Sequence, residues 1–347
     1  MYPMAPLVRT VLNTAARVAP GPAGRLAFHL FVRPLGRARP RPEEQALFAA
    51  ARTGHLRVRG KDVVTYAWGD GRRPVLLVHG WSSRASRLTA FAEALVERGY
   101  SPVAFDAPGH GESSGRASNI VEYRAIIREL HAEHGDFDAV VAHSFGVLAT
   151  HLALRDGVRA GRLVGIGGVG SFTMLLAGFR AGFGVSELVV RRMRAYVERR
   201  VAPGEPGLWD RFDADRSPAE LDLPVLLFHD EDDDMVPVVQ ARRLARAHGD
   251  RARLVVTRGL GHRRILTDPE VVAAAVEFVT AGAVKDPAVT APEGGIEPSG
   301  RIEPSGRIEP SGRIEPSDRI EPSDRIEPSG RIEPSDRVEP SGRVATG

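Results

Sequence analysis

From about residue 56 onward, short apolar runs alternate with longer stretches typical of helices. The run at 74–79 is apolar up to His79 and ends at Gly80, as expected of a strand that is buried on both faces. The same pattern predicts strands at 56–59, 63–68, 74–79, 102–106, 139–142, 163–167, 224–229 and 252–257, and helices at 86–98, 121–134, after residue 144, at 238–248 and at 269–280. Repeated units of this length predict an α/β fold with a mostly parallel central sheet and helices on both faces.

The composition of the chain limits which kinds of site and which classes of protein are possible. The chain has 347 residues, of which 42% are hydrophobic, so it can form one main domain with a sizeable core. Cysteine is absent, which excludes disulfides, a thiolate nucleophile and a cysteine zinc site. Residues 1–42 contain seven arginines and no acidic residue, whereas charge is balanced over 43–282. The main domain therefore lacks the basic surface of a nucleic-acid-binding protein.

Residues 1–52 form a basic, amphipathic N-terminal segment ahead of the main domain, which we expect to span 53–282. Arginines at 9, 17 and 25 interrupt its apolar runs, so it resembles neither a secretory signal nor a membrane span. We expect this segment to form helices that pack on the main domain. We also expect the protein to be cytoplasmic. The alternative that the sequence leaves open is weak contact with an anionic membrane surface, which would make the protein membrane-associated.

Residues 283–347 are a tail built from a six-residue repeat. From Ile296 the unit Ile-Glu-Pro-Ser-Gly/Asp-Arg recurs almost to the end of the chain. Proline in every unit prevents a continuous helix, and one aliphatic residue per unit buries too little surface to offset the entropy of ordering. We predict a disordered tail that acts as a spacer or docking strip for an unidentified partner, with a hexapeptide β-helix as the alternative.

Ser144 lies between the expected strand at 139–142 and the helix that follows. Its surroundings are Ala142-x-Ser144-x-Gly146, and small residues at these positions suit a sharp turn that pushes the serine out at the end of the strand. A serine hydroxyl needs a neighbouring base to become a nucleophile, and a carboxylate must orient that base. His262 is the candidate base, and the acidic loop 230–234 follows another expected strand.

Five loops that follow expected strands carry residues suited to catalysis or to a sharp turn. They hold His79-Gly80-Trp81, Asp106-x-Pro-Gly-His-Gly, Ser144, an Asp-x-x-Val-Pro loop that ends at Pro237, and Gly261-His262. In this order the motifs resemble the α/β-hydrolase family over about residues 56–281. The resemblance implies an α/β-hydrolase fold without a cofactor or a metal, in which the nucleophile, the acid and the histidine follow one another along the chain.

The resemblance also assigns roles. Ser144 would be the nucleophile, His262 the base and Asp233 the orienting acid, because Asp233 stands three residues before the valine of the Val-Pro pair. Asp230 and Asp232 remain alternatives for the acid. The backbone N–H groups of Trp81 and Phe145 would form the oxyanion hole.

Other polar residues in these loops are expected to brace them rather than to react. These residues are His79, His110, His143 and Asp106. The acidic loop lacks the spaced ligands of a calcium site.

Between residues 171 and 222 the alternation stops, and 188–200 is helical, basic and amphipathic. We expect a short helical cap whose apolar residues line a pocket for an acyl or alcohol group. The predicted function is hydrolysis of a small carboxylic ester. Thioester hydrolysis, acyl transfer and a non-catalytic scaffold that binds through its tail are the alternatives.

Overall fold

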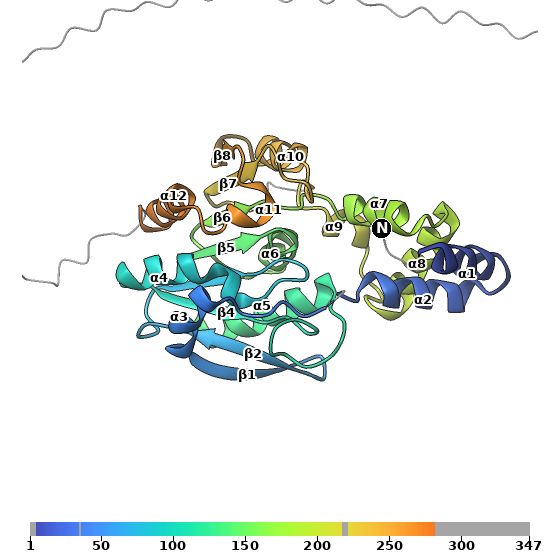
Figure 1. Ribbon diagram of the computed structural model, residues 1–347, viewed down its shortest axis with the longest axis horizontal. Coiled ribbons are helices and arrows are strands. Elements are labelled where there is room, and N and C mark those ends of the chain that lie inside the picture. The colour runs from blue at the N-terminus through green and yellow to red at the C-terminus, as the bar shows by residue number, and fades with distance from the viewer. Residues whose placement is uncertain (1–4, 35, 217–220, 282–347) are drawn as a thin grey trace, which may run out of the picture. The chain divides into compact units, whose positions relative to one another are not determined.

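The computed structural model describes residues 5–34, 36–216 and 221–281 (Figure 1). The predicted repeat tail at 283–347 lies outside these residues. Within them, no helix is both long enough and apolar enough to cross a membrane.

An eight-stranded sheet forms the centre of the described chain (Figure 1). Its strands, in chain order, are β1 (Arg52–Val58), β2 (Lys61–Ala67), β3 (Pro74–Val78), β4 (Ser101–Phe105), β5 (Ala139–His143), β6 (Leu163–Ile166), β7 (Val225–Asp230) and β8 (Ala252–Thr257). Their spatial order is β1-β2-β4-β3-β5-β6-β7-β8. Neighbours from β4 to β8 are parallel, whereas β1 and β2 form an antiparallel hairpin that joins β4 antiparallel. The hairpin turns at Arg59 and Gly60, which both have positive φ angles.

Helices cover both faces of the sheet. They are α3 (Gln45–Ala49), α4 (Thr89–Glu97), α5 (Ile120–His134), α6 (Phe145–Arg155), α10 (Val239–His248), α11 (Gly261–Arg264) and α12 (Pro269–Thr280). Successive strand residues point to opposite faces, so Leu77 and Val141 pack with α4 and α12 while Leu76 and Val140 pack with α5 and α6. Because both of their faces are buried, strands β3 to β7 are largely apolar, and the α/β fold class expected from the sequence is confirmed.

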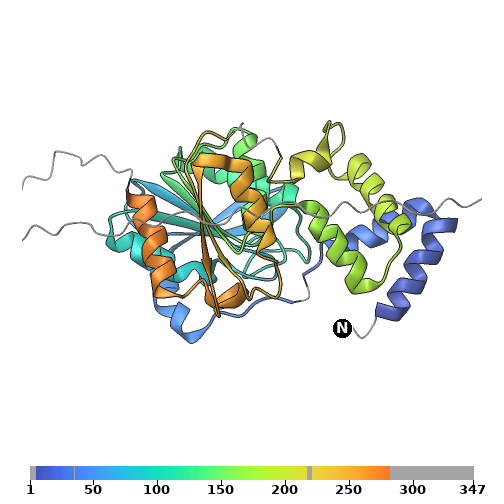
Figure 2. The same ribbon diagram turned by 90° about the horizontal axis from the view of Figure 1, so that it is seen from above.

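Five further helices lie together beside the sheet (Figures 1 and 2). They are α1 (Ala5–Val18), α2 (Pro20–Phe31), α7 (Phe172–Phe183), α8 (Glu187–Arg200) and α9 (Leu208–Phe212), and we call them the helical cover. A Cβ atom at Gly24 of α2 would lie 2.3 Å from the carbonyl oxygen of Arg192 in α8, so glycine permits this close approach. The rings of Phe28 and Tyr196 also meet, with centroids 5.4 Å apart. The N-terminal segment thus packs against helices that follow it by more than 150 residues.

Candidate active site

Ser144 occupies the turn between β5 and α6, with φ 55° and ψ −120°. A positive φ is uncommon for a residue with a side chain, and the surrounding contacts must hold it. A Cβ atom at Gly80 would lie 2.8 Å from the Cβ of Ser144, and one at Gly146 would lie 2.6 Å from the carbonyl oxygen of Val78. Close backbone approach therefore explains why small residues surround the serine.

The side chains of Ser144, His262 and Asp233 lie in one line of hydrogen bonds. Nε2 of His262 is 3.0 Å from Oγ of Ser144, and Nδ1 is 2.7 Å from Oδ2 of Asp233. All three residues are buried. With its Nδ1 proton donated to the carboxylate, the imidazole presents an Nε2 lone pair to the serine hydroxyl, so this geometry can accept the hydroxyl proton.

Asp233 is held in place by the backbone of its own loop. Its Oδ1 accepts hydrogen bonds from the N–H groups of Met235 at 2.9 Å and Val236 at 2.8 Å. Burial works to raise the pKa of this carboxyl, but the hydrogen bonds from His262 and from the loop outweigh it and leave the pKa below its usual value. The carboxylate is therefore charged at neutral pH and can accept the Nδ1 hydrogen bond of His262.

The other two acids predicted for this role point elsewhere. Asp230 accepts hydrogen bonds from the hydroxyl of Thr257 at 2.7 Å and from the N–H of Leu260 at 3.0 Å. Asp232 accepts one from the N–H of Gly259 at 3.0 Å. Both carboxylates tie the acidic loop to the segment before His262, and Asp233 alone of the three contacts that histidine. Within the described residues, no group of three or more His, Asp, Glu or Cys side chains could hold a metal ion.

The two residues predicted for the oxyanion hole lie side by side. Phe145 is the first residue of α6, so its N–H has no acceptor within the helix. Trp81 follows Gly80, which approaches Ser144 closely, and the rings of Trp81 and Phe145 meet with centroids 5.6 Å apart. Both backbone segments therefore flank the serine.

His79, His110 and Asp106 have the contacts of loop braces. Nε2 of His79 accepts the N–H of Ala107 at 3.0 Å, and Nε2 of His110 accepts that of Ser82 at 3.1 Å. Burial lowers the pKa of His79 to about 4 and that of His110 to about 3, so both rings are neutral acceptors at neutral pH. The carboxylate of Asp106 likewise accepts hydrogen bonds from two backbone N–H groups.

Two further histidines contact the hydrogen-bonded line. Nε2 of His143 lies 3.0 Å from the carbonyl oxygen of His262, and the two rings lie 4.7 Å apart. Nε2 of His229 donates to the carbonyl oxygen of Val236 at 2.7 Å and lies 3.4 Å from Oδ2 of Asp233. Sequence reasoning placed His143 away from the reaction and did not single out His229. The signal was their place at the carboxyl ends of strands before site loops, His143 as the last residue of β5 and His229 as the second last of β7.

A cavity of about 570 Å³ opens beside Ser144. Its walls on the side of the loops include Trp81, Phe145 and Val236. The helical cover provides much of a largely apolar lining, which includes Phe28, Phe31, Phe172, Leu176, Phe179, Met193, Val197, Trp209 and Phe212. We call it the apolar pocket. Its lining includes α2, which sequence analysis did not connect with the site.

Comparisons with known proteins agree with this architecture. The model of the alpha/beta hydrolase family matches residues 75–275. A curated relative, the non-heme haloperoxidase of Rhodococcus erythropolis, is 26% identical over 247 residues, which are 58% of this chain and 90% of that protein. The solved esterase Pf2001 of Pyrococcus furiosus has a TM-score of 0.53 and 18% identity, over 72% of this chain and 97% of that one. Mouse alpha/beta hydrolase domain-containing protein 10 has a TM-score of 0.52 and 16% identity, over 67% and 98%.

Proposed function

This chain belongs to the alpha/beta hydrolase family, and within that family we propose that it is a serine hydrolase that cleaves carboxylic esters. The observation that carries the proposal is the line of hydrogen bonds from Asp233 through His262 to Ser144, at the edge of the apolar pocket. A nucleophile, a base and an orienting acid in contact are what acyl transfer through a serine requires.

In the first step, Oγ of Ser144 attacks the ester carbonyl carbon while its proton passes to Nε2 of His262. The carbonyl oxygen becomes an oxyanion, to which the N–H groups of Trp81 and Phe145 donate hydrogen bonds. The charge of Asp233 stabilises the imidazolium that has formed. When the C–O bond to the alcohol breaks, His262 returns the proton to the leaving oxygen, and the acyl group remains on the serine.

In the second step, water takes the place of the alcohol. Nε2 of His262 accepts a proton from the water as its oxygen attacks the acyl carbon, and the same oxyanion position is used again. The bond to Oγ of Ser144 then breaks, the serine recovers its proton from the imidazolium, and the carboxylic acid leaves. No oxidant or reductant takes part in either step.

The apolar pocket indicates the class of ester. It has a volume of about 570 Å³, and most of its lining is aromatic or aliphatic. Each methylene group that the pocket buries contributes about 0.8 kcal/mol. We therefore propose a substrate with an apolar acyl or alcohol part, and we propose that the stretch 171–222 acts as the cap over it. Thioesters fit the same chemistry, and an alcohol in place of water would turn hydrolysis into acyl transfer.

Labelling with a fluorophosphonate probe tests the proposal. The probe reacts with activated serines, and peptide mass spectrometry should locate the adduct on Ser144. The Ser144→Ala variant should lose the adduct, whereas Ser83→Ala, a control in the loop after Trp81, should retain it. Folded protein that gives no adduct on Ser144 would contradict the proposal and favour the non-catalytic scaffold. p-Nitrophenyl esters of increasing chain length would then define the acyl preference.

Halide oxidation is a second candidate, because the Rhodococcus relative named a haloperoxidase matches over nine-tenths of its length. Hydrogen peroxide in place of water would take the acyl group from Ser144 as a peracid, which oxidises halide and returns the carboxylic acid. Halogenation that needs peroxide, a carboxylic acid and an intact Ser144 would support this activity. Halogenation that persists in Ser144→Ala would exclude this route.

A further inference from the structure

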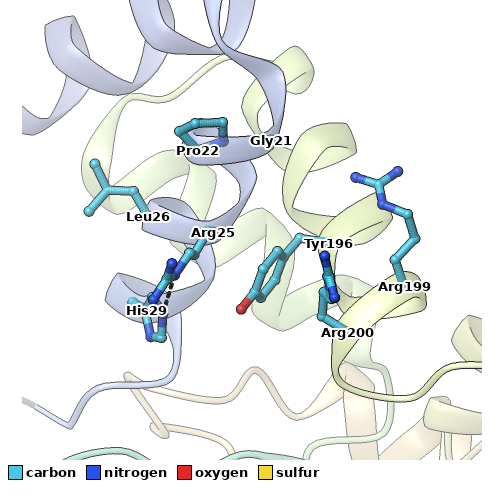
Figure 3. A pocket seen from close by; sticks show the side chains of 8 residues that line it. All are labelled: Gly21, Pro22, Arg25, Leu26, His29, Tyr196, Arg199 and Arg200. Atoms are coloured by element: carbon cyan, nitrogen blue, oxygen red, sulfur yellow. Dashed lines mark hydrogen bonds between the residues drawn. The ribbon is translucent and has the colours of Figure 1, made fainter.

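A second cavity, of about 580 Å³, lies between α2 and α8 (Figure 3). Its lining consists of Gly21, Pro22, Arg25, Leu26, His29, Tyr196, Arg199 and Arg200, and we call it the basic cavity. None of these residues lines the apolar pocket, although Phe28 and Val197 of the same two helices do. The two helices therefore form a shared wall with an apolar side toward the apolar pocket and a basic side away from it.

The lining of the basic cavity carries positive charge and no carboxylate. Figure 3 shows Arg25 and His29 on α2 and Tyr196, Arg199 and Arg200 on α8. Between these five side chains the structure has one hydrogen bond, from Nε of Arg25 to Nε2 of His29 at 3.4 Å. Several cations that gather in one hollow repel one another, so the cavity is suited to an anion.

Within the described residues, neither acidic residue of α8 forms an ion pair with an arginine of the basic cavity, and each has another partner. Glu187 lies 3.3 Å from Arg180 of α7. Glu198 accepts a hydrogen bond of 2.6 Å from Nε1 of Trp209 in α9. The segment that leads into and includes α2 adds no acid, since residues 1–42 contain none. In the described part of the chain, Arg25, Arg199 and Arg200 thus form no ion pair, which leaves them available to an anionic ligand.

Exposed apolar side chains lie on α2 itself and on α1, which packs against both α2 and α8. In the described part of the chain seven large hydrophobic residues are exposed, and four of them, Leu7, Val11, Val18 and Leu26, belong to α1 and α2. Leu7, Val11 and Val18 lie on one face of α1, while Leu12 faces the core. Binding of a free phosphate would not account for these exposed aliphatic side chains. Helices that combine exposed aliphatic residues with arginines are typical of surfaces that lie in the interface of an anionic membrane.

We propose that α1, α2 and α8 form a docking surface for an anionic membrane, on which the basic cavity receives a lipid phosphodiester headgroup. Arg25, Arg199 and Arg200 donate hydrogen bonds to its phosphate oxygens, since a guanidinium matches phosphate geometry. Leu7, Val11 and Val18 enter the boundary between headgroups and acyl chains. The docking depends on these helices alone and does not require catalysis.

Vesicle flotation with the full chain tests this surface. At low salt the protein should float with vesicles of phosphatidylcholine and phosphatidylglycerol, and it should stay behind with phosphatidylcholine alone. The triple variant Arg25→Gln, Arg199→Gln, Arg200→Gln should bind the anionic vesicles about 100-fold more weakly. The control Arg57→Gln, Arg98→Gln, Arg253→Gln removes the same charge from other exposed positions and should change binding less than about threefold. Equal losses of vesicle binding in the two variants would show that the basic cavity is not the binding site and would overturn the proposal.

Two further measurements separate the lipid from other ligands. The pair Val11→Gln, Val18→Gln should lower vesicle binding about tenfold, whereas Val239→Gln, Val256→Gln, which alters exposed valines elsewhere, should not. Titration calorimetry with inorganic phosphate and with glycerol phosphate should give no saturable binding at micromolar concentrations. Tight binding of either soluble phosphate, together with indifference to anionic vesicles, would replace the membrane with a soluble ligand and overturn the proposal.

Discussion

The loops at the end of the sheet and the helical cover border the same apolar pocket, but different forces hold them. In the loops, carboxylates and imidazoles accept directed hydrogen bonds, as Asp233 does from two N–H groups of its own loop. In the cover, rings pack on rings, as Phe31 does edge-on against Phe179 with centroids 5.5 Å apart. Hydrogen bonds restrict direction as well as distance, whereas apolar packing mainly preserves volume. We therefore expect the loops to determine the chemistry and the cover to determine which substrates enter.

Removing the proposed nucleophile or the proposed base should have the largest effect. We expect Ser144→Ala and His262→Ala each to lower kcat for a p-nitrophenyl ester by about 10⁵- to 10⁶-fold, with the melting temperature almost unchanged. The double variant should be no slower than either single one, because the two side chains act as a unit. Additive losses measured by steady-state kinetics would contradict that coupling.

Two aspartates of one loop should separate catalysis from support. Asp233→Asn leaves His262 without a charged partner and should lower kcat about 10²- to 10⁴-fold. Asp230→Asn loses acceptors for Thr257 and Leu260 and should instead lower the free energy of unfolding by about 1–3 kcal/mol, measured with urea. If Asp230→Asn had the larger effect on kcat, the acid would be misassigned.

Acid should weaken the part of the molecule that contains buried imidazoles. Nε2 of His151 in α6 lies 3.0 Å from Nε2 of His248 in α10. Burial, with the positive charge of neighbouring groups, lowers the pKa of His151 to about 3 and that of His248 to about 4. Below about pH 6.5, the usual pKa of histidine, both residues bind protons in the unfolded chain but stay neutral in the folded one. The free energy of unfolding therefore falls as the pH drops.

For this pair, urea unfolding should show a loss of about 2–4 kcal/mol between pH 6.5 and 5. The variant His151→Gln, His248→Gln should have a correspondingly shallower dependence on pH, whatever its stability at pH 7. Equal slopes for the variant and the parent protein would show that this pair does not stay neutral in the folded state.

A change in the cover should have the smallest effect and should depend on the substrate. Phe31→Ala removes one wall of the apolar pocket, so kcat/KM for long-chain esters should fall about tenfold more than for the acetate. The matched control is Phe48→Ala, whose ring packs against Tyr66 outside this pocket. A uniform loss for all chain lengths would mean that Phe31 supports the loops rather than the substrate.

Much of the sheet could be predicted because local sequence determines it. Strands buried on both faces have uninterrupted apolar runs, and the residues that follow them, such as His79 and Ser144, are the ones that a parallel sheet brings to one edge. The choice among the acids could not be made in the same way. Asp230, Asp232 and Asp233 differ only in how a tight loop directs each carboxylate, and the hydrogen-bond partners at 257–261 that decide this are distant in sequence.

The contribution of α2 to the apolar pocket was also hidden from sequence. Phe28 and Phe31 lie in a segment that looks like a separate basic helix, and nothing near them in sequence indicates contact with α8. Gly24 offered a faint signal, because glycine within a helix often marks close packing. Its partner, the backbone of Arg192, is known only once the chain has folded.

The packing of α2 against α8 also affects when this part of the molecule can fold during synthesis. Phe28 leaves the ribosome 168 residues before Tyr196, the ring that it contacts. At about 5–20 residues per second, the apolar side of α2 waits roughly ten to thirty seconds for its partner to be synthesised. During synthesis this helix must therefore be shielded by a chaperone, by the membrane or by transient contacts of its own, and the apolar pocket is among the last features of the molecule to form.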